Sequence, residues 1–346
     1  MTIDASYYCG NKAFSVEQKT TPPPAQGEVQ IDVAYCGLCG TDIHIFHGQM
    51  DARTGDHRII GHEMSGVISR LGPDVEGFEP GQNVVVRPLI HCRDCPTCRR
   101  GYEHICQNLK FIGIDTDGAL QEKWNVPSHT VHIIPEGLSL KHAALAEPLA
   151  VACHDVRRAR VTKGEDVLII GGGPIGILIG LVARHLGAIV VISEINETRI
   201  EIAETMGFRT VNPKKVDVGA ALQTMTDTKG MDVVFEVSGV QAGIDLMTEA
   251  AATRARICMV AIHASKPQVD LFQFFWKELE MLGARVYEAD DYEMALGLLA
   301  DGKIPADPII TDLRGLDEVG DALGSLTSDP TMLKTLIQVG GHKEAP

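Results

Sequence analysis

The sequence predicts a two-domain α/β protein, in which a β-rich domain accompanies a domain built on a doubly wound parallel sheet. Three observations support this fold class. The chain has 346 residues, a length that suits about two domains. Its first 135 residues consist of short strand-like segments separated by turns. From Leu140 to about Ala284, strand-like and helix-like segments alternate, which is typical of a parallel sheet covered by helices.

Alternating side chains mark the strands of the β-rich domain. Val29–Ala34 alternates apolar and polar residues, Val84–Val86 is a β-branched run, and turn signals such as Leu71–Asp74 separate such segments. The pattern indicates a barrel-like domain with loop insertions. The C-terminal segment is mixed in character and is expected to return to this domain, which would then comprise residues 1–146 and 288–346.

The second domain is expected over residues 147–287, where buried strands are followed by helices. The expected strands are Asp166–Ile170, Ala188–Ile192, Asp232–Glu236 and Arg256–Val260, and the expected helices are Ile177–Leu186 and Glu197–Met206. Because helices connect these strands, we expect the strands to run parallel in one sheet.

Charge and composition exclude several functions. The chain carries 31 basic and 46 acidic side chains, a net charge of -15, which argues against a nucleic-acid-binding surface. The most apolar run, Val167–Ala183, contains glycines and Pro174 and is expected to form a strand, a turn and a helix instead of a membrane span. The N-terminal residues lack the basic and apolar regions of a signal peptide. We therefore expect a cytoplasmic protein that binds neither nucleic acid nor membrane.

A glycine-rich turn in the second domain predicts a dinucleotide site. The segment Gly171-Gly172-Gly173-Pro174-Ile175-Gly176 fits G-x-G-x-x-G between an expected strand and an expected helix. The first glycine of this motif permits a tight turn, the second admits a pyrophosphate, and the third lets helix and strand pack closely. The pyrophosphate would meet the free N–H groups at the start of the helix.

Glu194 decides which dinucleotide is expected. It ends the next expected strand, eighteen residues after Gly176. A carboxylate there can bind the ribose hydroxyls and would repel a 2′-phosphate, so NAD is expected in preference to NADP. The alternative is a packing turn in an α/β sheet, with Glu194 exposed to solvent.

A cluster of cysteines in the first domain predicts a structural zinc site. Four cysteines follow the pattern C-x2-C-x2-C-x7-C, namely Cys92, Cys95, Cys98 and Cys106. Four thiolates close a tetrahedral zinc shell and leave no position open for a substrate. Two flanking histidines, His91 and His104, are expected to be exposed because the shell is already complete. A chain of this length needs no disulfide framework, so a reducing compartment is expected.

A second, open zinc site is expected around Cys39 and His62. A catalytic zinc needs a third protein ligand and one position free for water or substrate. Glu63, next to His62, and Glu147, near the domain junction, compete for this role, and either could bind the metal directly. Cys36 is expected to be a small buried apolar residue and not a ligand.

At these motifs the chain resembles the zinc-containing medium-chain alcohol dehydrogenases, and the resemblance spans nearly its whole length. It rests on C-G-T-D-x-H from Cys39 to His44, G-H-E from Gly61 to Glu63, the cysteine cluster, Glu147-Pro148 and the glycine motif. It implies a GroES-like fold for the β-rich domain, a Rossmann fold for the second domain, and two zinc ions per chain, one catalytic and one structural. It also implies a homo-oligomer, either a dimer or a tetramer.

The resemblance further implies roles for individual residues. Thr41 and His44 have the spacing that the family uses to relay the substrate proton, and Asp42 could orient a zinc ligand. Arg199 would cover the adenine. The nicotinamide half of the cofactor would be lined by Val260, Ala261, Ile262, Ala284, Arg285 and Val286. The substrate would be contacted by Ile45, Phe46, Phe111 and Tyr287.

Within the family, the segment Ala146–Val151 resembles the polyol branch of sorbitol, xylitol and butanediol dehydrogenases. The expected function is hydride transfer from a small secondary alcohol or polyol, sorbitol-like or a vicinal diol, to NAD, which gives a ketone or ketose. Ile45 stands where sorbitol dehydrogenases tend to have an aromatic residue, which speaks against sorbitol itself.

Two alternative functions stay open. An amino-alcohol dehydrogenase of the L-threonine 3-dehydrogenase type shares the motifs but typically carries D-P where Glu147-Pro148 stands. The other alternative, from a different class, is a non-catalytic NAD-binding subunit with a structural or regulatory role. The intact set of Cys39, His62 and Glu147 argues against it.

Overall fold

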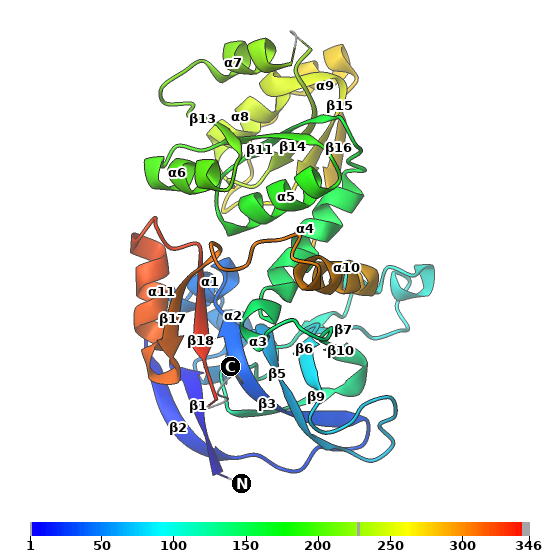
Figure 1. The fold of residues 1–346 in the computed structure, drawn as a ribbon, viewed down its shortest axis with the longest axis vertical. Helices are drawn as coiled ribbons and strands as arrows, with labels where there is room; N and C mark the ends of the chain where they lie inside the picture. The colour runs from blue at the N-terminus through cyan, green and yellow to red at the C-terminus, as the bar shows by residue number, and fades with distance from the viewer. Residues whose placement is uncertain (1, 227–228, 341–346) are drawn as a thin grey trace. The chain divides into compact units, whose positions relative to one another are not determined.

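The computed structural model describes residues 2–226 and 229–340, which divide into two compact units (Figure 1). Unit 1 combines residues 2–147 with residues 288–340, and unit 2 is Pro148–Tyr287. The two ends of the domain expected over 1–146 and 288–346, residue 1 and residues 341–346, lie outside the described residues. None of the helices in the described residues combines the length and the apolarity needed to cross a membrane.

Unit 1 is organised around a mixed, mostly antiparallel sheet with the path β10-β6-β5-β3-β18-β17, to which β9 adds by pairing with β3. The strands are β3 (Glu28–Gly37), β5 (Glu63–Leu71), β6 (Asn83–Val86), β9 (Lys123–Pro127), β10 (Val131–Ile133), β17 (Ile310–Gly315) and β18 (Lys334–Gln338). The C-terminal strand β18 pairs antiparallel with β3, so the end of the chain completes the N-terminal sheet.

Smaller elements complete unit 1. A three-stranded sheet has the order β2-β1-β4, and β7 pairs with β8. These strands are β1 (Thr2–Tyr8), β2 (Phe14–Thr20), β4 (Arg58–Ile59), β7 (Leu89–Ile90) and β8 (Lys110–Phe111). The helices are α1 (Gly40–Phe46), α2 (Asp51–Thr54), α3 (Leu140–Ala143), α10 (Ala289–Ala300) and α11 (Val319–Ser328), and the 3-10 helices are η1 (Cys98–Arg100), η2 (Glu103–Ile105), η3 (Ser128–Thr130) and η4 (Leu316–Glu318).

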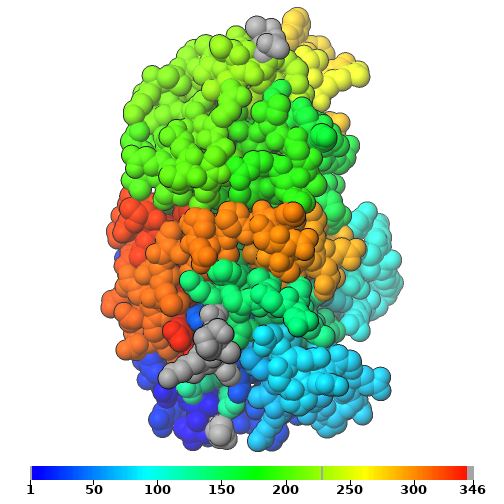
Figure 2. Space-filling model, viewed as in Figure 1, coloured from blue at the N-terminus to red at the C-terminus, as the bar shows by residue number. Residues whose placement is uncertain are grey.

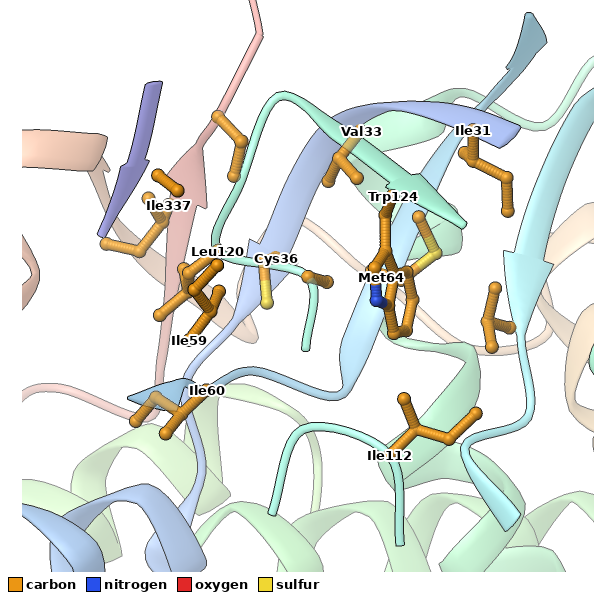
Figure 3. Packing of buried hydrophobic residues seen from close by; sticks show 14 of the residues in the cluster. Ile31, Val33, Cys36, Ile59, Ile60, Met64, Ile112, Leu120, Trp124 and Ile337 are labelled. Carbon is orange, nitrogen blue, oxygen red and sulfur yellow. The ribbon is translucent and has the colours of Figure 1, made fainter. Parts of the chain in front are cut away.

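The core of unit 1 is a continuous apolar cluster beneath these strands (Figure 3). Ile31 and Val33 project from the same face of β3 because alternate residues of a strand share a face. Cys36 lies in this cluster with no exposed surface, which confirms the prediction that it is a buried apolar residue. The indole of Trp124 packs there as well, and its Nε1 donates to the carbonyl of Asp117 at 3.1 Å.

Unit 2 contains one fully parallel sheet with the order β13-β12-β11-β14-β15-β16, which confirms the predicted doubly wound fold. This order is the 3-2-1-4-5-6 arrangement of a Rossmann domain. The strands are β11 (Asp166–Ile170), β12 (Ile189–Ser193), β13 (Arg209–Val211), β14 (Met231–Glu236), β15 (Ala251–Met259) and β16 (Glu280–Gly283). The helices are α5 (Pro174–His185), α6 (Glu197–Thr205), α7 (Val218–Met225), α8 (Gln241–Ala250) and α9 (Leu271–Lys277), and α4 (Ala146–Arg158) leads into the unit.

Candidate active site

Cys39 lies at the start of α1, where a backbone N–H group of the helix donates to its sulfur. Cys39 is the N-cap residue, and its Sγ accepts the backbone N–H of Thr41 at 3.2 Å. Asp42 is fully buried and accepts the backbone N–H of Cys39 at 3.0 Å, which closes a capping box. The helix end directs an N–H group at the sulfur, but burial raises the pKa of the Cys39 thiol above its ordinary value. A metal ion would supply the positive charge that stabilises the thiolate.

His62 and Glu63 reach the same place from the beginning of β5. Gly61, just before them, has φ +98°, and a Cβ at this position would lie 2.7 Å from the sulfur of Cys36. Only glycine permits this turn without strain. The turn brings His62 Nε2 to 3.1 Å from Cys39 Sγ.

Cys39, His62 and Glu63 form a group of metal-donor side chains. Ligand atoms of Cys39, His62 and Glu63 all lie within 4.8 Å of one another, and His62 and Glu63 are buried. One thiolate, one imidazole and one carboxylate are an ordinary donor set for a catalytic zinc. Within the described residues this group does not include Glu147, which lies in the first turn of α4 with 5% of its surface exposed.

The electrostatics of this site favour a bound cation. Burial alone would lower the pKa of His62, but the nearby Cys39, Asp42 and Glu147 raise it well above its ordinary value. Asp42 Oδ1 lies 3.8 Å from His62 Nδ1, which places it to orient the ring. Acidic groups around one histidine attract positive charge, as a zinc site requires.

Sequence reasoning missed Lys334, which reaches the site from β18. Its Nζ lies 2.8 and 2.6 Å from the two carboxylate oxygens of Glu63 and donates to the carbonyl of Leu38 at 3.0 Å. Burial lowers the pKa of Lys334, but Glu63 and Cys39 outweigh that effect, so the net pKa is raised. The available signal was a lysine inside an apolar strand, since a buried lysine needs an acidic partner.

The cysteine cluster forms a closed four-sulfur site in a lobe of unit 1, visible as a cyan projection in Figure 2. The Sγ atoms of Cys95 and Cys98 are 3.5 Å apart, those of Cys95 and Cys106 3.8 Å, and those of Cys106 and Cys92 3.4 Å. A tetrahedron with zinc–sulfur bonds of about 2.3 Å places sulfurs about 3.8 Å apart, so the spacing suits zinc.

Backbone N–H groups prepare this lobe for metal. Cys95 N donates to Cys92 Sγ at 3.4 Å and Cys98 N donates to Cys95 Sγ at 3.5 Å. The backbone N–H groups of Cys98 and Gln107 lower the pKa of the Cys95 thiol to about 6. Thiolates are the zinc-binding form, so the Cys95 sulfur is prepared for a metal, whereas burial and the neighbouring Cys95 raise the pKa of the Cys98 thiol.

The two histidines beside the lobe are not exposed, which corrects the prediction. The side chain of His91 is 4% exposed and faces Glu103 at 3.2 Å, and the side chain of His104 is 8% exposed and lies 3.7 Å from Glu288. Each ring therefore has an acidic partner, although neither belongs to the four-sulfur group.

The four residues predicted to contact the substrate differ in their location and exposure. Phe111 presents the edge of its ring to His62, with centroids 5.1 Å apart and planes at 89°, so it lies beside the metal-donor set. Ile45 and Phe46 are instead packed in the core, at 0% and 8% exposure. They share the inward face of α1 with Asp42, and their contact with a substrate stays a prediction. Tyr287 has no exposed surface.

The two residues of the expected proton relay differ in exposure. Thr41 is partly exposed and follows the N-cap of α1, next to Cys39. His44 is exposed in the last turn of α1, and its Nδ1 lies 2.6 Å from Gln49 Oε1. An exposed imidazole can exchange its proton with water directly.

The glycine turn of unit 2 has the shape that a dinucleotide needs. Gly171 has φ +111°, and a Cβ on Gly176 would lie 2.0 Å from the carbonyl oxygen of Gly171. A Cβ on Gly173 would meet only Arg199 Nη1, at 3.9 Å, so the turn leaves open space there. The three glycines thus provide a turn, an approach for a ligand and a close helix contact. Pro174 and Ile175 form the first turn of α5 directly behind this opening.

Glu194 lies against this turn and is buried, at 7% exposure, instead of facing solvent. Its Oε2 accepts the N–H of Gly172 at 2.7 Å, and its Oε1 accepts the N–H groups of Ile195 and Asn196 at 2.7 and 2.9 Å. A carboxylate can accept about four hydrogen bonds, so Glu194 keeps capacity for a hydroxyl.

Other predicted cofactor residues follow the carboxyl ends of the same parallel sheet. Val260, Ala261 and Ile262 come directly after β15, and Ala284, Arg285 and Val286 come directly after β16. Carboxyl ends of parallel strands meet at one edge, where ligands of such sheets bind. Sequence reasoning missed Glu236, which is fully buried at the end of β14 and accepts the N–H groups of Ser238 and Gly239 at 3.0 and 3.1 Å.

The fold and the two sites together define a zinc-type oxidoreductase, and comparison with known proteins identifies the family. Residues 25–136 match the alcohol dehydrogenase GroES-like domain, and residues 174–301 match the zinc-binding dehydrogenase domain. The chain is 52% identical to 2-dehydro-3-deoxy-L-galactonate 5-dehydrogenase of Pseudoalteromonas atlantica, over 98% of this chain and 99% of that protein.

Two further relatives show the breadth of the match. The chain is 34% identical to L-threonine 3-dehydrogenase of Pyrococcus abyssi, over 90% of this chain and 91% of that protein. A zinc-binding dehydrogenase of Sinorhizobium meliloti, solved with NADP bound, superimposes with a TM-score of 0.91 at 31% identity and covers 98% of this chain and 99% of its own. The chain belongs to the zinc-containing medium-chain dehydrogenases and is an enzyme of the zinc-dependent alcohol dehydrogenase type.

Proposed function

We propose that the protein oxidises a secondary hydroxyl group of a sugar acid to a ketone, with NAD as the hydride acceptor. The identity of 52% to a sugar-acid 5-dehydrogenase over almost the whole chain is the observation that carries this proposal. The C5 hydroxyl of a six-carbon acid is a secondary alcohol, so the proposal keeps the expected reaction and changes only the substrate from a neutral polyol to an acid.

The catalytic zinc would be held by Cys39 and His62, with Glu63 or Glu147 as the third protein ligand. The structural zinc would be held by the four cysteines of the lobe. When bound, zinc supplies a Lewis acid that favours loss of the alcohol proton, and NAD supplies the hydride acceptor.

The residues of the chain would orient the substrate and move its proton. Oxidation removes a hydride from the carbinol carbon and a proton from its oxygen. The hydroxyl group of Thr41 would take part in passing that proton on, and the exposed His44 would deliver it to water. Asp42 would hold the His62 ring in place, and Phe111 would form one wall beside it.

Glu194 supports the preference for NAD. Its carboxylate, held by three backbone N–H groups, would accept a ribose hydroxyl group and repel a 2′-phosphate. Arg199 lies near Gly173 and would cover the adenine. The nicotinamide would bind along Val260–Ile262 and Ala284–Val286, where Tyr287 follows.

Neutral polyols and L-threonine are the second candidates, since sorbitol, butanediol and L-threonine dehydrogenases are also among the relatives. Measuring NADH formation with sugar acids, sorbitol, butanediol and L-threonine would decide between them. The proposal predicts that kcat/KM is greatest for a sugar acid, and a greater value for any of the other three would overturn it.

An oligomer formed through unit 2 is also proposed. The unpaired edge strand β16 and the short helix α9 carry large exposed apolar side chains, namely Leu271, Phe272, Phe275, Trp276 and Met281. A free edge strand can pair with its own copy about a two-fold axis, and such a contact would cover this apolar surface.

A further inference from the structure

Arg87 is a buried cation without a partner. It follows β6, only 8% of its surface is exposed, and its Nε is buried without a hydrogen bond. Within residues 2–226 and 229–340, its guanidinium takes part in no ion pair and no side-chain hydrogen bond. Buried arginines are almost always paired, because an unpaired charge is costly to remove from water. This residue takes no part in the chemistry proposed above.

Arg87 is also surrounded by further basic groups. Its charge contributes to a lowered pKa of His129 and of His132, although burial is the larger cause in both. The rings of His91 and His129 meet edge to face with centroids 6.0 Å apart. Arg93, which is exposed, donates from its Nε to Nε2 of His91 at 3.3 Å. Such a basic group is unexpected in a chain whose net charge is -15.

The nearby carboxylates do not neutralise Arg87. Glu103 pairs with His91 at 3.2 Å, and Glu293 pairs with the Nδ1 atom of His132. Both carboxylates therefore contact histidines and leave the guanidinium unpaired. Its five N–H donors form a planar fork that matches a carboxylate or a phosphate.

We propose that Arg87, with His129 and Arg93 at its exposed rim, forms a binding site for a small oxyanion, either a carboxylate or a phosphate. A bound oxyanion would supply the missing acceptors for Nε and the negative charge that the described residues lack. His129 and Arg93 are both exposed, so they would admit the ion from solvent.

One source of this oxyanion is the substrate, an idea that rests on the proposed function. Tyr292 connects the two regions: its hydroxyl donates to the carbonyl of Val86 at 2.9 Å, immediately before Arg87. The charges of Glu147, Glu63 and Arg87 all act on this one tyrosine. A sugar acid has its carboxylate four carbons from the C5 hydroxyl, so one molecule could use both regions. Free phosphate is the other source.

Two arms of one experiment separate these sources. In the first, KM and kcat are measured for 2-dehydro-3-deoxy-L-galactonate and for sorbitol with wild-type enzyme, Arg87→Gln and His129→Asn. In the second, the melting temperature of each protein is followed with sodium phosphate against sodium chloride at equal ionic strength. Arg100→Gln, an exposed arginine near the same lobe, is the matched control. His129→Asn changes an exposed residue and should fold, so it still tests the site if Arg87→Gln does not fold.

If the substrate carboxylate is the ligand, KM for the sugar acid rises about 10- to 100-fold in Arg87→Gln, and less in His129→Asn, with kcat and sorbitol turnover unchanged. If free phosphate is the ligand, phosphate raises the melting temperature of the wild type but not of Arg87→Gln, and KM stays constant. Unchanged KM together with an equal phosphate response in all variants would overturn the site. If the wild type does not oxidise the sugar acid, the proposed substrate fails, and the phosphate arm alone decides the oxyanion site.

Discussion

Lys334 Nζ lies 2.6 Å from Glu63 Oε2, and both side chains are at most 3% exposed. The pair joins the last described strand of the chain to the residue that follows His62 in sequence.

Replacing Lys334 by Met is therefore expected to lower the free energy of unfolding by about 3–5 kcal/mol, because Glu63 would be left as an unpaired buried charge. Urea unfolding measures this. Lys303→Met, which changes an exposed lysine, is the control and should stay within about 0.5 kcal/mol of the wild type. In the double variant Lys334→Met with Glu63→Gln, part of the loss should be recovered. Wild-type stability for Lys334→Met alone would show that the pair does not hold the sheet together.

The four-sulfur lobe should release zinc on acidification. The pKa of the Cys95 thiol is lowered from 9.0 to about 6, chiefly by the backbone N–H of Cys98. A lowered pKa in the folded state stabilises that state fully above the ordinary thiol value, and the effect is lost as pH falls through about 6. Below about pH 6 protons also compete with zinc for the Cys95 sulfur, so zinc retention followed with a metal indicator should fall steeply there. Release that begins well above pH 7 would contradict this.

Cofactor preference should depend on Glu194. In Glu194→Ser the 2′-phosphate would no longer be repelled, and we expect the NAD-to-NADP ratio of kcat/KM to fall at least about tenfold. The control is Glu197→Gln, an exposed acid of α6 that pairs with Lys215 at 2.8 Å. A ratio that is the same in Glu194→Ser, Glu197→Gln and wild type would rule out the assigned role.

The apolar surface on α9 and β16 should mediate self-association. Phe275 and Trp276 are 76% and 70% exposed, and introducing a charge by Phe275→Glu should shift the mass measured by light scattering toward the monomer. Ile133→Glu, at an apolar residue of unit 1 that is 46% exposed, serves for comparison and should leave the mass unchanged. If light scattering shows that the wild-type protein is a monomer, the proposed oligomer is wrong.

The sequence motifs predicted the parts of the site that are local. His62 and Glu63 are adjacent, and the four cysteines lie within one short segment, so their spacing carried the information. Lys334 could not be found in this way, because it meets Glu63 across 271 positions through strand pairing in the folded sheet. Whether Glu63 or Glu147 is the third ligand of the catalytic zinc likewise depends on distances in the folded protein, which the spacing of residues along the sequence does not give.

The failures of prediction have a common physical origin. Ile45 and Phe46, whose contact with a substrate stays a prediction, point into the core because of the phase of α1, which the C-G-T-D-x-H motif does not contain. His91 and His104 seemed free because the zinc shell was complete, yet the fold placed Glu103 and Glu288 beside them. Strand positions of unit 2 were predicted well, since buried parallel strands form continuous apolar runs.

The most direct test of the account is NADH formation from 2-dehydro-3-deoxy-L-galactonate, with zinc content measured on the same samples of wild type, Cys39→Ala and Cys95→Ala. We expect two zinc ions per chain in the wild type and a loss of turnover of more than about 1,000-fold in Cys39→Ala, because Lewis-acid stabilisation disappears. Cys95→Ala should lose stability before it loses chemistry. Substantial turnover by Cys39→Ala, or a wild-type enzyme that holds only the lobe zinc, would contradict the account.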